Sequence, residues 1–250
     1  MPVVSLTKHH GLGNDFLVLI DADNAMPLTA DLARLLCDRH TGVGADGLIR
    51  ATPGPVPADL TFELRNADGS PAEMSGNGMR CMAQAAVDAG IVAGPRLAVA
   101  TVAGVREVTV EPETAPGLRQ VRVDMGPAKA EDHPSGTLVD MGNPHLVILD
   151  QDCSCELEAL GRQHADRNVE LIAVRSRDEI DLRVWERGVG ATLACGTGSC
   201  AAVAAARLWG MVDSRVTVHN PGGDVVVEAE GESMFLTGPT QFVARIEVAL

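Results

Sequence analysis

An internal repeat constrains the fold of this 250-residue chain more than any other feature. The segment Ser75-Gly-Asn-Gly precedes a helix-like stretch ending at Gly90, and it recurs 120 positions later as Cys195-Gly-Thr-Gly before a similar stretch. Residues 13–19 likewise match residues 142–148 at an offset of 129. Such self-similarity indicates two copies of one structural unit. We therefore expect two similar domains, residues 1–112 plus 240–250 and residues 113–239, with the Pro/Gly-containing stretch 111–117 as the linker.

Hydrophobic periodicity predicts a mixed α/β chain that is rich in strands and has about four helices. Capping and stop signals predict the helices at residues 29–40, 78–89, 155–165 and 198–209. Alternating Val, Leu and Ile residues predict strands that include residues 60–65, 107–111, 120–125, 138–141, 146–150, 169–174, 181–185, 216–219, 225–229 and 243–248.

Charge and composition exclude several classes of partner. Asp and Glu total 34 against 20 Lys and Arg, which gives a formal net charge of −14 and leaves no basic run to bind duplex nucleic acid or an anionic membrane. With four Phe, two Trp and no Tyr, stacking platforms for single strands are also absent from the sequence. The longest uncharged stretch, residues 188–206, is too polar to span a bilayer, and the first residues lack a secretion signal. We expect a cytoplasmic protein.

Neither a metal nor a cofactor is predicted. The six cysteines do not form a disulfide framework, and the pair Cys153 and Cys155 has no further ligands at zinc spacing. Residues 42–47 match the dinucleotide fingerprint by letters, but they follow a predicted helix and precede a strand-like run, which is the reverse of the required context. Lys8 and Lys129 are the two lysines, and neither lies in a setting that favours a Schiff base.

The repeats suggest acid/base chemistry. Each one places a small side chain, Ser75 or Cys195, directly before a glycine-flanked helix start, where unpaired N–H groups attract an anion and favour thiolate over thiol. Two such groups suit removal of a proton from one face of a carboxylate-bearing molecule and its return to the other face. Simpler interpretations exist, since serine is a common N-cap and a lone cysteine is most often a buried apolar residue.

Further polar clusters lie at predicted strand ends and loops, where binding groups are often carried. Each of them is also compatible with an ordinary turn, a surface ion pair or a structural histidine. The clusters contain Asn14, Asn66, Asn143 with His145, Asn168, and Glu186 with Arg187.

Seven motifs taken together, in order and spacing, resemble the diaminopimelate epimerase family over nearly the whole chain. They begin at His10, Gly42, Asn66, Gly142, Trp185, Ala194 and Pro221. The resemblance implies two pseudo-symmetric α/β domains, each a barrel-like mixed sheet around a central helix, with the active site in the cleft between them. It also implies a cofactor-independent epimerase that interconverts LL- and meso-diaminopimelate for lysine and peptidoglycan synthesis, and a homodimer.

The resemblance also assigns roles to individual residues. The two acid/base positions are Ser75 and Cys195, and His145 and Glu186 support them. Substrate contacts are implied for Asn14, Asn66, Asn143, Asn168 and Arg187. Gly76, Asn77, Gly196 and Thr197 would supply helix-start N–H groups to the reacting carboxylate.

Ser75 is the main departure, because the family has cysteine at this position. A natural serine would severely impair proton exchange on that face, whereas an engineered serine would make the chain a substrate-trapping form of an ordinary epimerase. Two alternatives stay open. One is an enzyme of other specificity, such as a histidine racemase or a one-base dehydratase or exchange catalyst. The other is a non-catalytic protein that binds diaminopimelate.

Overall fold

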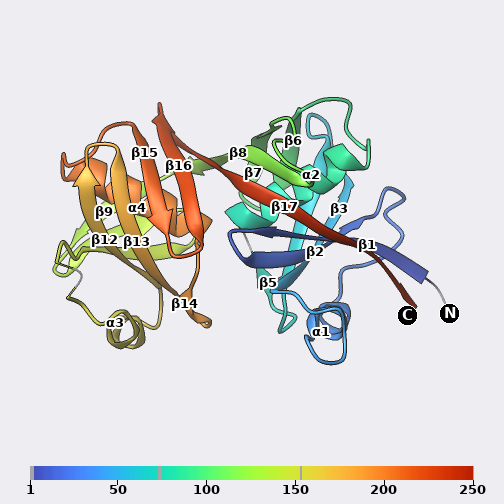
Figure 1. Ribbon diagram of the computed structural model, residues 1–250, viewed down its shortest axis with the longest axis horizontal. Coiled ribbons are helices and arrows are strands. Elements are labelled where there is room, and N and C mark those ends of the chain that lie inside the picture. Colours follow the sequence, from blue (N-terminus) through green and yellow to red (C-terminus); the bar gives the residue numbers. More distant parts are fainter. Residues whose placement is uncertain (1–2, 73–74, 153, 250) are drawn as a thin grey trace. The chain divides into compact units, whose positions relative to one another are not determined.

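The computed structural model describes residues 3–72, 75–152 and 154–249, and the chain divides into two compact units (Figure 1). Unit 1 comprises residues 1–123 with 239–250, and unit 2 comprises residues 124–238. The bounds expected from the repeat, residues 1–112 with 240–250 and residues 113–239, stay a prediction. The stretch 111–117 is not a linker between units, because it connects β7 (Gly104–Val110) to β8 (Leu118–Pro127) and these strands pair inside unit 1.

The strands of unit 1 form a closed ring. They pair in the order β1–β2–β3–β4–β6–β7–β8–β17, and β17 pairs back with β1, so the sheet closes into a barrel. Besides β7 and β8, the strands are β1 (Val3–Gly11), β2 (Asn14–Ile20), β3 (Gly47–Pro53), β4 (Leu60–Asn66), β5 (Pro71–Ala72), β6 (Arg96–Thr101) and β17 (Ser233–Ala249). The short β5 pairs with β4 outside the ring.

A central helix fills this barrel. In α2 (Gly76–Asp88), residues 76–86 are all buried, and the helix contacts β1, β2, β3, β4 and β7. The shorter α1 (Ala30–Cys37) contacts β3 and β4 and buries Ala33, Leu36 and Cys37 in a hydrophobic cluster with residues of β1, β2 and β3. Burying apolar side chains on both sides of the sheet stabilises the unit.

Unit 2 repeats the plan with a curved sheet around α4 (Gly196–Leu208), which contacts seven of its strands (Figure 1). The strands pair in the order β9–β10–β11–β12–β13–β15–β16–β17, and β14 pairs with the end of β13. Their bounds are β9 (Lys129–His133), β10 (Gly136–Asp140), β11 (Pro144–Leu149), β12 (Asn168–Ser176), β13 (Glu179–Glu186), β14 (Gly190–Thr192), β15 (Arg215–Asn220) and β16 (Gly223–Glu230). The peripheral α3 (Leu157–Gln163) contacts β12, β13 and β14.

Equivalent strand registers confirm the repeat in three dimensions. In unit 1, β2 runs parallel to β3 with Phe16 opposite Gly47, and in unit 2, β11 runs parallel to β12 with His145 opposite Asn168. Ile49 lies two residues after Gly47 in β3, and Glu170 lies two residues after Asn168 in β12, so these two residues are equivalent. The units therefore present the same backbone frame with different side chains.

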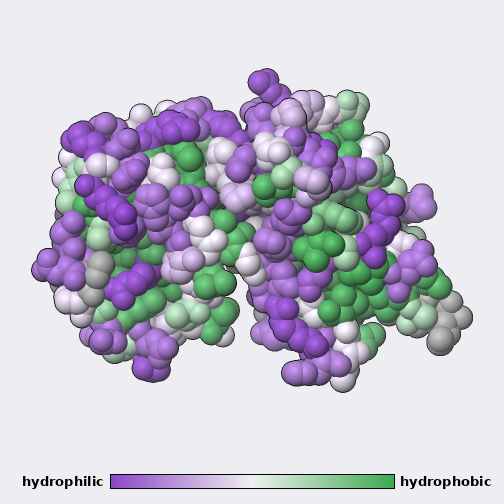
Figure 2. Space-filling view, viewed as in Figure 1, coloured by the Kyte–Doolittle hydropathy of each residue, from purple (hydrophilic) through white to green (hydrophobic). Residues whose placement is uncertain are grey.

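All four predicted helices and all ten named strands are present. The two central helices begin at residues 76 and 196, however, rather than at 78 and 198. Glycine has a weak helix propensity, which favours a later start. Burial of residues 76–78 and 196–198 in the folded units outweighs this preference. Figure 2 shows hydrophilic side chains over much of the visible surface, as the many charged residues require.

Candidate active site

Ser75 and Cys195 are the N-caps of the two central helices. Ser75 has an extended backbone (φ −142°, ψ 114°), and its Oγ accepts a hydrogen bond from Gly78 N at 3.0 Å. Cys195 has a similar backbone (φ −126°, ψ 120°), and its Sγ accepts from Gly198 N at 3.3 Å. The two predicted acid/base positions therefore hold equivalent places, next to helix-start N–H groups that lack intrahelical partners.

The first two residues of each central helix are the ones predicted to supply those N–H groups. They are all buried: Gly76 and Asn77 in α2, Gly196 and Thr197 in α4. The third residue of each helix is a glycine, and a side chain there would be more crowded in α4 than in α2. A Cβ on Gly198 would lie 2.7 Å from Glu170 Oε1, and a Cβ on Gly78 would lie 3.2 Å from Ile49 Cδ1.

Cys195 is buried and surrounded by acidic groups. Burial raises the pKa of its thiol well above the ordinary value, and the carboxyl groups of Glu186 and Glu170 raise this pKa further. Hydrogen bonds with Thr197 and Gly198 N act in the opposite direction but have a smaller effect. The N–H group at the helix start thus lowers the thiol pKa, as expected, but burial and the two carboxyl groups outweigh it, so the thiol form is favoured.

Glu186 lies at the end of β13, and its carboxyl group lies close enough to the Cys195 thiol to influence the thiol pKa. Its Oε1 also accepts a hydrogen bond from Thr192 Oγ1 at 2.6 Å. Burial raises the pKa of the Glu186 carboxyl, and the neighbouring Glu170 raises it as well. The Glu186 carboxyl and the Cys195 thiol thus both favour their protonated forms.

His145 forms a buried pair with Glu170, which the sequence analysis did not single out. His145 Nδ1 lies 2.6 Å from Glu170 Oε1, and neither side chain is exposed. Among the described residues, Glu170 Oε2 has no hydrogen-bond partner. The available sequence signal was one acidic residue inside the apolar run Val169–Val174. A buried polar atom without a partner is costly and calls for a reason.

A hydrogen-bond chain continues from this pair to the sulfur. Asn143 Oδ1 lies 3.0 Å from His145 Nε2, Asn143 Nδ2 lies 3.4 Å from Thr197 Oγ1, and Thr197 Oγ1 lies 3.4 Å from Cys195 Sγ. The structure thus brings together four predicted site residues of unit 2.

Asn168 and Arg187 form a separate contact in unit 2. Asn168 is buried, and its Oδ1 accepts a hydrogen bond from Arg187 N at 2.8 Å. The Arg187 side chain is exposed, with Nη1 donating to Asp166 O at 3.4 Å. The bond from Asn168 fixes the backbone directly after Glu186. The Arg187 residue itself is exposed to solvent.

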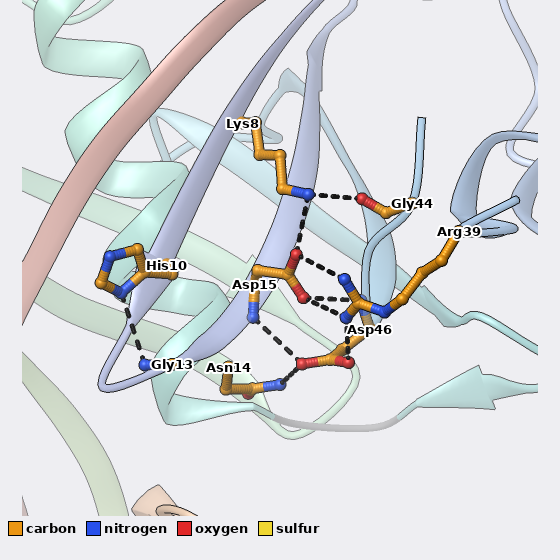
Figure 3. Close-up of polar contacts among 8 residues, drawn as sticks. All are labelled: Lys8, His10, Gly13, Asn14, Asp15, Arg39, Gly44 and Asp46. Carbon is orange, nitrogen blue, oxygen red and sulfur yellow. Dashed lines mark hydrogen bonds and ion pairs between the residues drawn. The ribbon is translucent and has the colours of Figure 1, made fainter. Parts of the chain in front are cut away.

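In unit 1, Asn14 contacts an ion-pair cluster (Figure 3), and it also contacts the start of α2. Asn14 Oδ1 accepts from Asn77 Nδ2 at 3.1 Å, and Asn14 Nδ2 donates to Asp46 Oδ2 at 2.8 Å. Arg39 Nη2 bridges Asp46 Oδ1 at 2.8 Å and Asp15 Oδ1 at 2.6 Å. Asp46 and Arg39 were not singled out from the sequence, because Asp-Gly after a glycine-rich stretch is typical of a turn.

Asp15 is the most strongly held acid of this cluster. Burial alone would raise the pKa of its carboxyl, but hydrogen bonds from Arg39 and Lys8 outweigh burial and lower the pKa to about 2. Lys8 Nζ lies 2.9 Å from Asp15 Oδ2 and also donates to Gly44 O at 2.6 Å. The Asp15 carboxyl therefore stays ionised near neutral pH.

Asn66 ends β4 and lies opposite Gly47 in the sheet register. Its Nδ2 donates to Ser70 Oγ at 3.0 Å, within its own turn. Asp46 is linked to the same turn, because Ala67 N donates to Asp46 O at 2.9 Å. Asn66 thus lies at the same sheet end as Asn14, although its side chain bonds a different partner.

Within residues 3–72, 75–152 and 154–249, no group of three His, Cys, Asp or Glu side chains is arranged to hold a metal ion. The Cys153-Ser-Cys155 pattern includes Cys153, which lies outside the described residues. Among those same residues, no helix combines the length and apolar character needed to cross a bilayer.

Comparisons with known proteins agree with this arrangement. The family model described as diaminopimelate epimerase matches residues 6–131 and 137–243. A diaminopimelate epimerase from Pelotomaculum thermopropionicum is 42% identical, covering 95% of this chain and 96% of the relative. One from Synechocystis is also 42% identical, covering 96% and 97%.

Solved structures show the same fold at much lower identity. A phenazine biosynthesis protein of the PhzF family from Bacillus anthracis has a TM-score of 0.77 at 14% identity, with full coverage of both chains. A probable proline racemase from Agrobacterium radiobacter K84 has a TM-score of 0.74 at 18% identity, covering 99% of this chain and 93% of that one. With the family model and the close relatives each covering nearly the whole sequence, the chain belongs to the diaminopimelate epimerase family.

Proposed function

We propose that this chain interconverts LL- and meso-diaminopimelate without a cofactor, by two-base proton transfer, in the synthesis of lysine and peptidoglycan precursors. The observation that carries the proposal is the pair of equivalent N-cap positions, Ser75 and Cys195, in a chain of this family. One group removes the α proton of the substrate, and the other returns a proton to the opposite face of the same carbon.

Cys195 is the intact acid/base group of the pair. Because its thiol form is favoured, it is ready to protonate a carbanion-like intermediate, and the thiolate that results is nucleophilic enough to remove a proton in the reverse direction. His145 and Glu186 support it. The helix-start N–H groups of Gly196 and Thr197, and of Gly76 and Asn77, would stabilise the negative charge that develops on the reacting carboxylate.

Ser75 should slow proton exchange on the face of the substrate α carbon that this residue serves. A serine hydroxyl is a far weaker acid than a thiol and needs an adjacent base to act as a nucleophile or base. The loss of a positioned general base typically costs 10²- to 10⁴-fold in rate. A natural serine would then mean an impaired enzyme, and an engineered one would mean a trapped form of an active parent.

The substrate contacts proposed for Asn14, Asn66, Asn143, Asn168 and Arg187 favour a ligand with two amino-acid centres. A simple monocarboxylate would leave several of these polar groups unpaired, and buried unpaired groups weaken binding. A homodimer in the cytoplasm, with no nucleic acid or membrane as partner, stays a prediction.

Proton NMR with LL-diaminopimelate in D₂O tests this function. The chain with Ser75 is compared with Ser75→Cys and with Ser75→Cys/Cys195→Ala. We expect the single variant to epimerise the substrate and incorporate deuterium at the α carbon at least 100-fold faster than the chain with Ser75, and the double variant to do neither. Comparable turnover by the serine form would overturn the role given to position 75.

Ser75 itself favours one alternative, a protein that binds diaminopimelate without turning it over. Calorimetry on the natural chain distinguishes it. Binding with no deuterium incorporation, even in the Ser75→Cys variant, would identify a binding protein, and absence of binding would exclude both functions.

A further inference from the structure

A short hairpin in unit 2 returns the chain beside Glu186 (Figure 1). β13 ends at Glu186, and β14 pairs antiparallel with it, so that Gly190 lies opposite Glu186 and Thr192 lies opposite Val184. Residues that lie opposite each other share one face of the sheet, and so do residues two positions apart on one strand. Val184 is fully buried, so Glu186 and Thr192 lie on the face that packs against the core.

Thr192 is the diagonal neighbour of Glu186 across this hairpin. Diagonal neighbours are within reach of long side chains, and Gly190, directly opposite Glu186, has no side chain to compete for the contact. The turn fixes this geometry, since Val189 N donates to Glu186 O at 3.0 Å. Gly188 and Gly190 have φ values of 79° and 105°, a region that favours glycine. As a result, Thr192 Oγ1 donates a hydrogen bond to Glu186 Oε1 at 2.6 Å.

The Thr192 hydroxyl opposes the effect of burial on Glu186. Burial has the largest influence on the Glu186 carboxyl and raises its pKa, and the bond from Thr192 is the largest of the influences that lower this pKa. Glu170 on β12 raises the pKa as well, whereas Cys195 and His145 lower it by less than Thr192 does. A hydrogen bond from a hydroxyl stabilises a carboxylate more than a carboxylic acid. Thr192 thus increases the ionised fraction of Glu186 near neutral pH.

The strand itself does not need this hydroxyl. β14 pairs with β13 through backbone groups, and Ala191 takes part in the same ladder without a polar side chain. Valine has nearly the shape of threonine and also favours strands, so an apolar residue would suit this position. What distinguishes Thr192 is its bond to a carboxyl group that lies beside the Cys195 thiol and influences its protonation.

We propose that Thr192 is a positioning residue for the reaction, whose hydroxyl holds the Glu186 carboxylate by one oxygen and keeps it available to receive the proton of Cys195. In this step the S–H bond of Cys195 breaks, an O–H bond forms on Glu186, and the single negative charge moves from the carboxylate to the sulfur. The thiolate is the form that removes a proton from the substrate. This catalytic consequence rests on the proposed function, whereas the effect of Thr192 on Glu186 does not depend on it.

Carboxyl NMR of the ligand-free chain tests the inference without a substrate. In a chain with ¹³C-labelled glutamate, the side-chain signal of Glu186 is identified by its loss in Glu186→Gln and is followed from acid to alkaline pH. We expect Thr192→Val to lower the acid ionisation constant of Glu186 about tenfold, which moves the titration midpoint up by about one pH unit. Thr192→Ser keeps the hydroxyl and should keep the midpoint. An unchanged midpoint in Thr192→Val would overturn the inference.

Thr217→Val is the matched control. Thr217 is a half-buried residue of β15 in the same unit, and its side chain makes no hydrogen bond within the described part of the chain. This variant should leave the Glu186 midpoint in place, and a shift equal to that of Thr192→Val would also overturn the inference. If Thr192→Val does not fold, Thr192→Ala and Thr192→Ser provide the same comparison, because they differ only in the hydroxyl. The fluorescence of Trp185, next to Glu186, reports on folding.

Kinetics in the Ser75→Cys background test the catalytic consequence. Thr192 is not among the proposed substrate contacts, so Thr192→Val should lower kcat about tenfold at neutral pH and leave KM within about threefold of its parent. The loss should diminish as rising pH ionises Glu186, and Thr192→Ser should match its parent. A normal kcat together with a shifted midpoint would overturn the positioning role. If Ser75→Cys does not epimerise diaminopimelate, the proposed function fails, and the carboxyl titration still decides whether Thr192 stabilises the carboxylate.

Discussion

Ser75 and Cys195 perform the same backbone task with different chemistry. Each accepts a hydrogen bond from the glycine N–H three residues later, so each caps its helix. Cys195 is also buried, and burial together with the nearby carboxyl groups of Glu186 and Glu170 raises the pKa of its thiol. In Ser75 we find the cap without the titratable group. A capping bond is therefore compatible with a purely structural role and with a catalytic one, so the bond alone does not distinguish the two roles.

The two helix-start glycines provide a matched pair of substitutions. In Gly198→Ala the new Cβ would lie 2.7 Å from Glu170 Oε1, so the carboxyl group must move and its bond to His145 is strained. In Gly78→Ala the Cβ would lie 3.2 Å from Ile49 Cδ1, and a flexible methyl group can shift by a few tenths of an ångström. We expect Gly198→Ala to weaken diaminopimelate binding at least tenfold in calorimetry and Gly78→Ala to change it less than threefold. Equal losses would contradict the role of the buried pair.

His9 should make unit 1 sensitive to acid. It is fully buried, with Nε2 3.0 Å from Thr7 Oγ1 and Nδ1 3.2 Å from Gln84 Oε1, and burial lowers its pKa to about 4. The unfolded chain has an ordinary histidine pKa near 6.5 and takes up the proton first. The free energy of unfolding is therefore highest above pH 6.5 and falls by about 3 kcal/mol as the pH is lowered to 4.

Urea unfolding followed by circular dichroism measures this effect. His9→Gln lacks the titration, so its stability should change less between pH 6.5 and 4 than that of the natural chain. Parallel losses in the two proteins would assign the acid sensitivity to other groups.

At the level of single residues, the sequence pointed to the groups proposed to contact the substrate more readily than to the buried groups that they bond. Asn14, Asn143, His145 and Cys195 occur in motifs with glycine or proline, which mark loops and strand ends. Glu170 lies in the middle of an apolar strand, and its partner His145 is 25 residues away. Only the parallel pairing of β11 and β12 brings the two together, and strand pairing is not encoded in local periodicity.

At the scale of elements, alternating segments were predictable, and continuous apolar runs were predictable only in part. β15 and β16 alternate between buried and more exposed residues, whereas β3 and β12 are each buried along six consecutive residues, and of these two only β12 was named from the sequence. β9 is almost entirely polar and exposed, so it lacks the period of two that marks a half-buried strand. The early starts of α2 and α4 were missed for a related reason, since burial rather than propensity makes those glycines helical.

The cap of α2 should contribute measurable stability. Removing an N-cap oxygen typically costs about 1 kcal/mol, because a helix N–H loses its partner. We therefore expect Ser75→Ala to lower the free energy of unfolding of unit 1 by about 1 kcal/mol. Ser75→Cys should cost less, since Cys195 shows that sulfur accepts the equivalent bond at 3.3 Å.

Thr29→Ala provides a comparison, because Thr29 caps the peripheral α1 through the same type of bond at 3.1 Å. Urea unfolding monitored by far-ultraviolet circular dichroism gives both values. Identical stability of Ser75→Ala and the natural chain would show that the cap has no energetic role.

At the scale of the whole molecule, the last strand returns the chain to unit 1. The first part of β17 pairs with β16 in unit 2, and residues from Gln241 onward pair with β1. The returning segment also reaches the central helix, since Thr240 Oγ1 donates to Gln84 Oε1 at 3.0 Å. Unit 1 is therefore built from two distant parts of the sequence, whereas unit 2 is one continuous segment.

This difference predicts opposite outcomes for two truncations. A chain that ends at residue 238 lacks the strand that closes the barrel of unit 1, and it leaves β1 with an unpaired edge and the Gln84 contact unmade. Unit 1 should then be unfolded. Unit 2 should stay folded in that chain and as the isolated segment 124–238, because its sheet and α4 are complete within it.

The positions of the two tryptophans make the outcome measurable. Trp185 and Trp209 both belong to unit 2, so their fluorescence reports on that unit alone, while circular dichroism reports on both. In the 1–238 chain we expect a native-like tryptophan transition in urea together with a loss of about half of the dichroism signal. A control that removes only residues 247–250 keeps most of the β1 pairing and should retain both signals. Loss of the tryptophan transition in the 1–238 chain would mean that unit 2 depends on a folded unit 1, which the continuous contacts of unit 2 argue against.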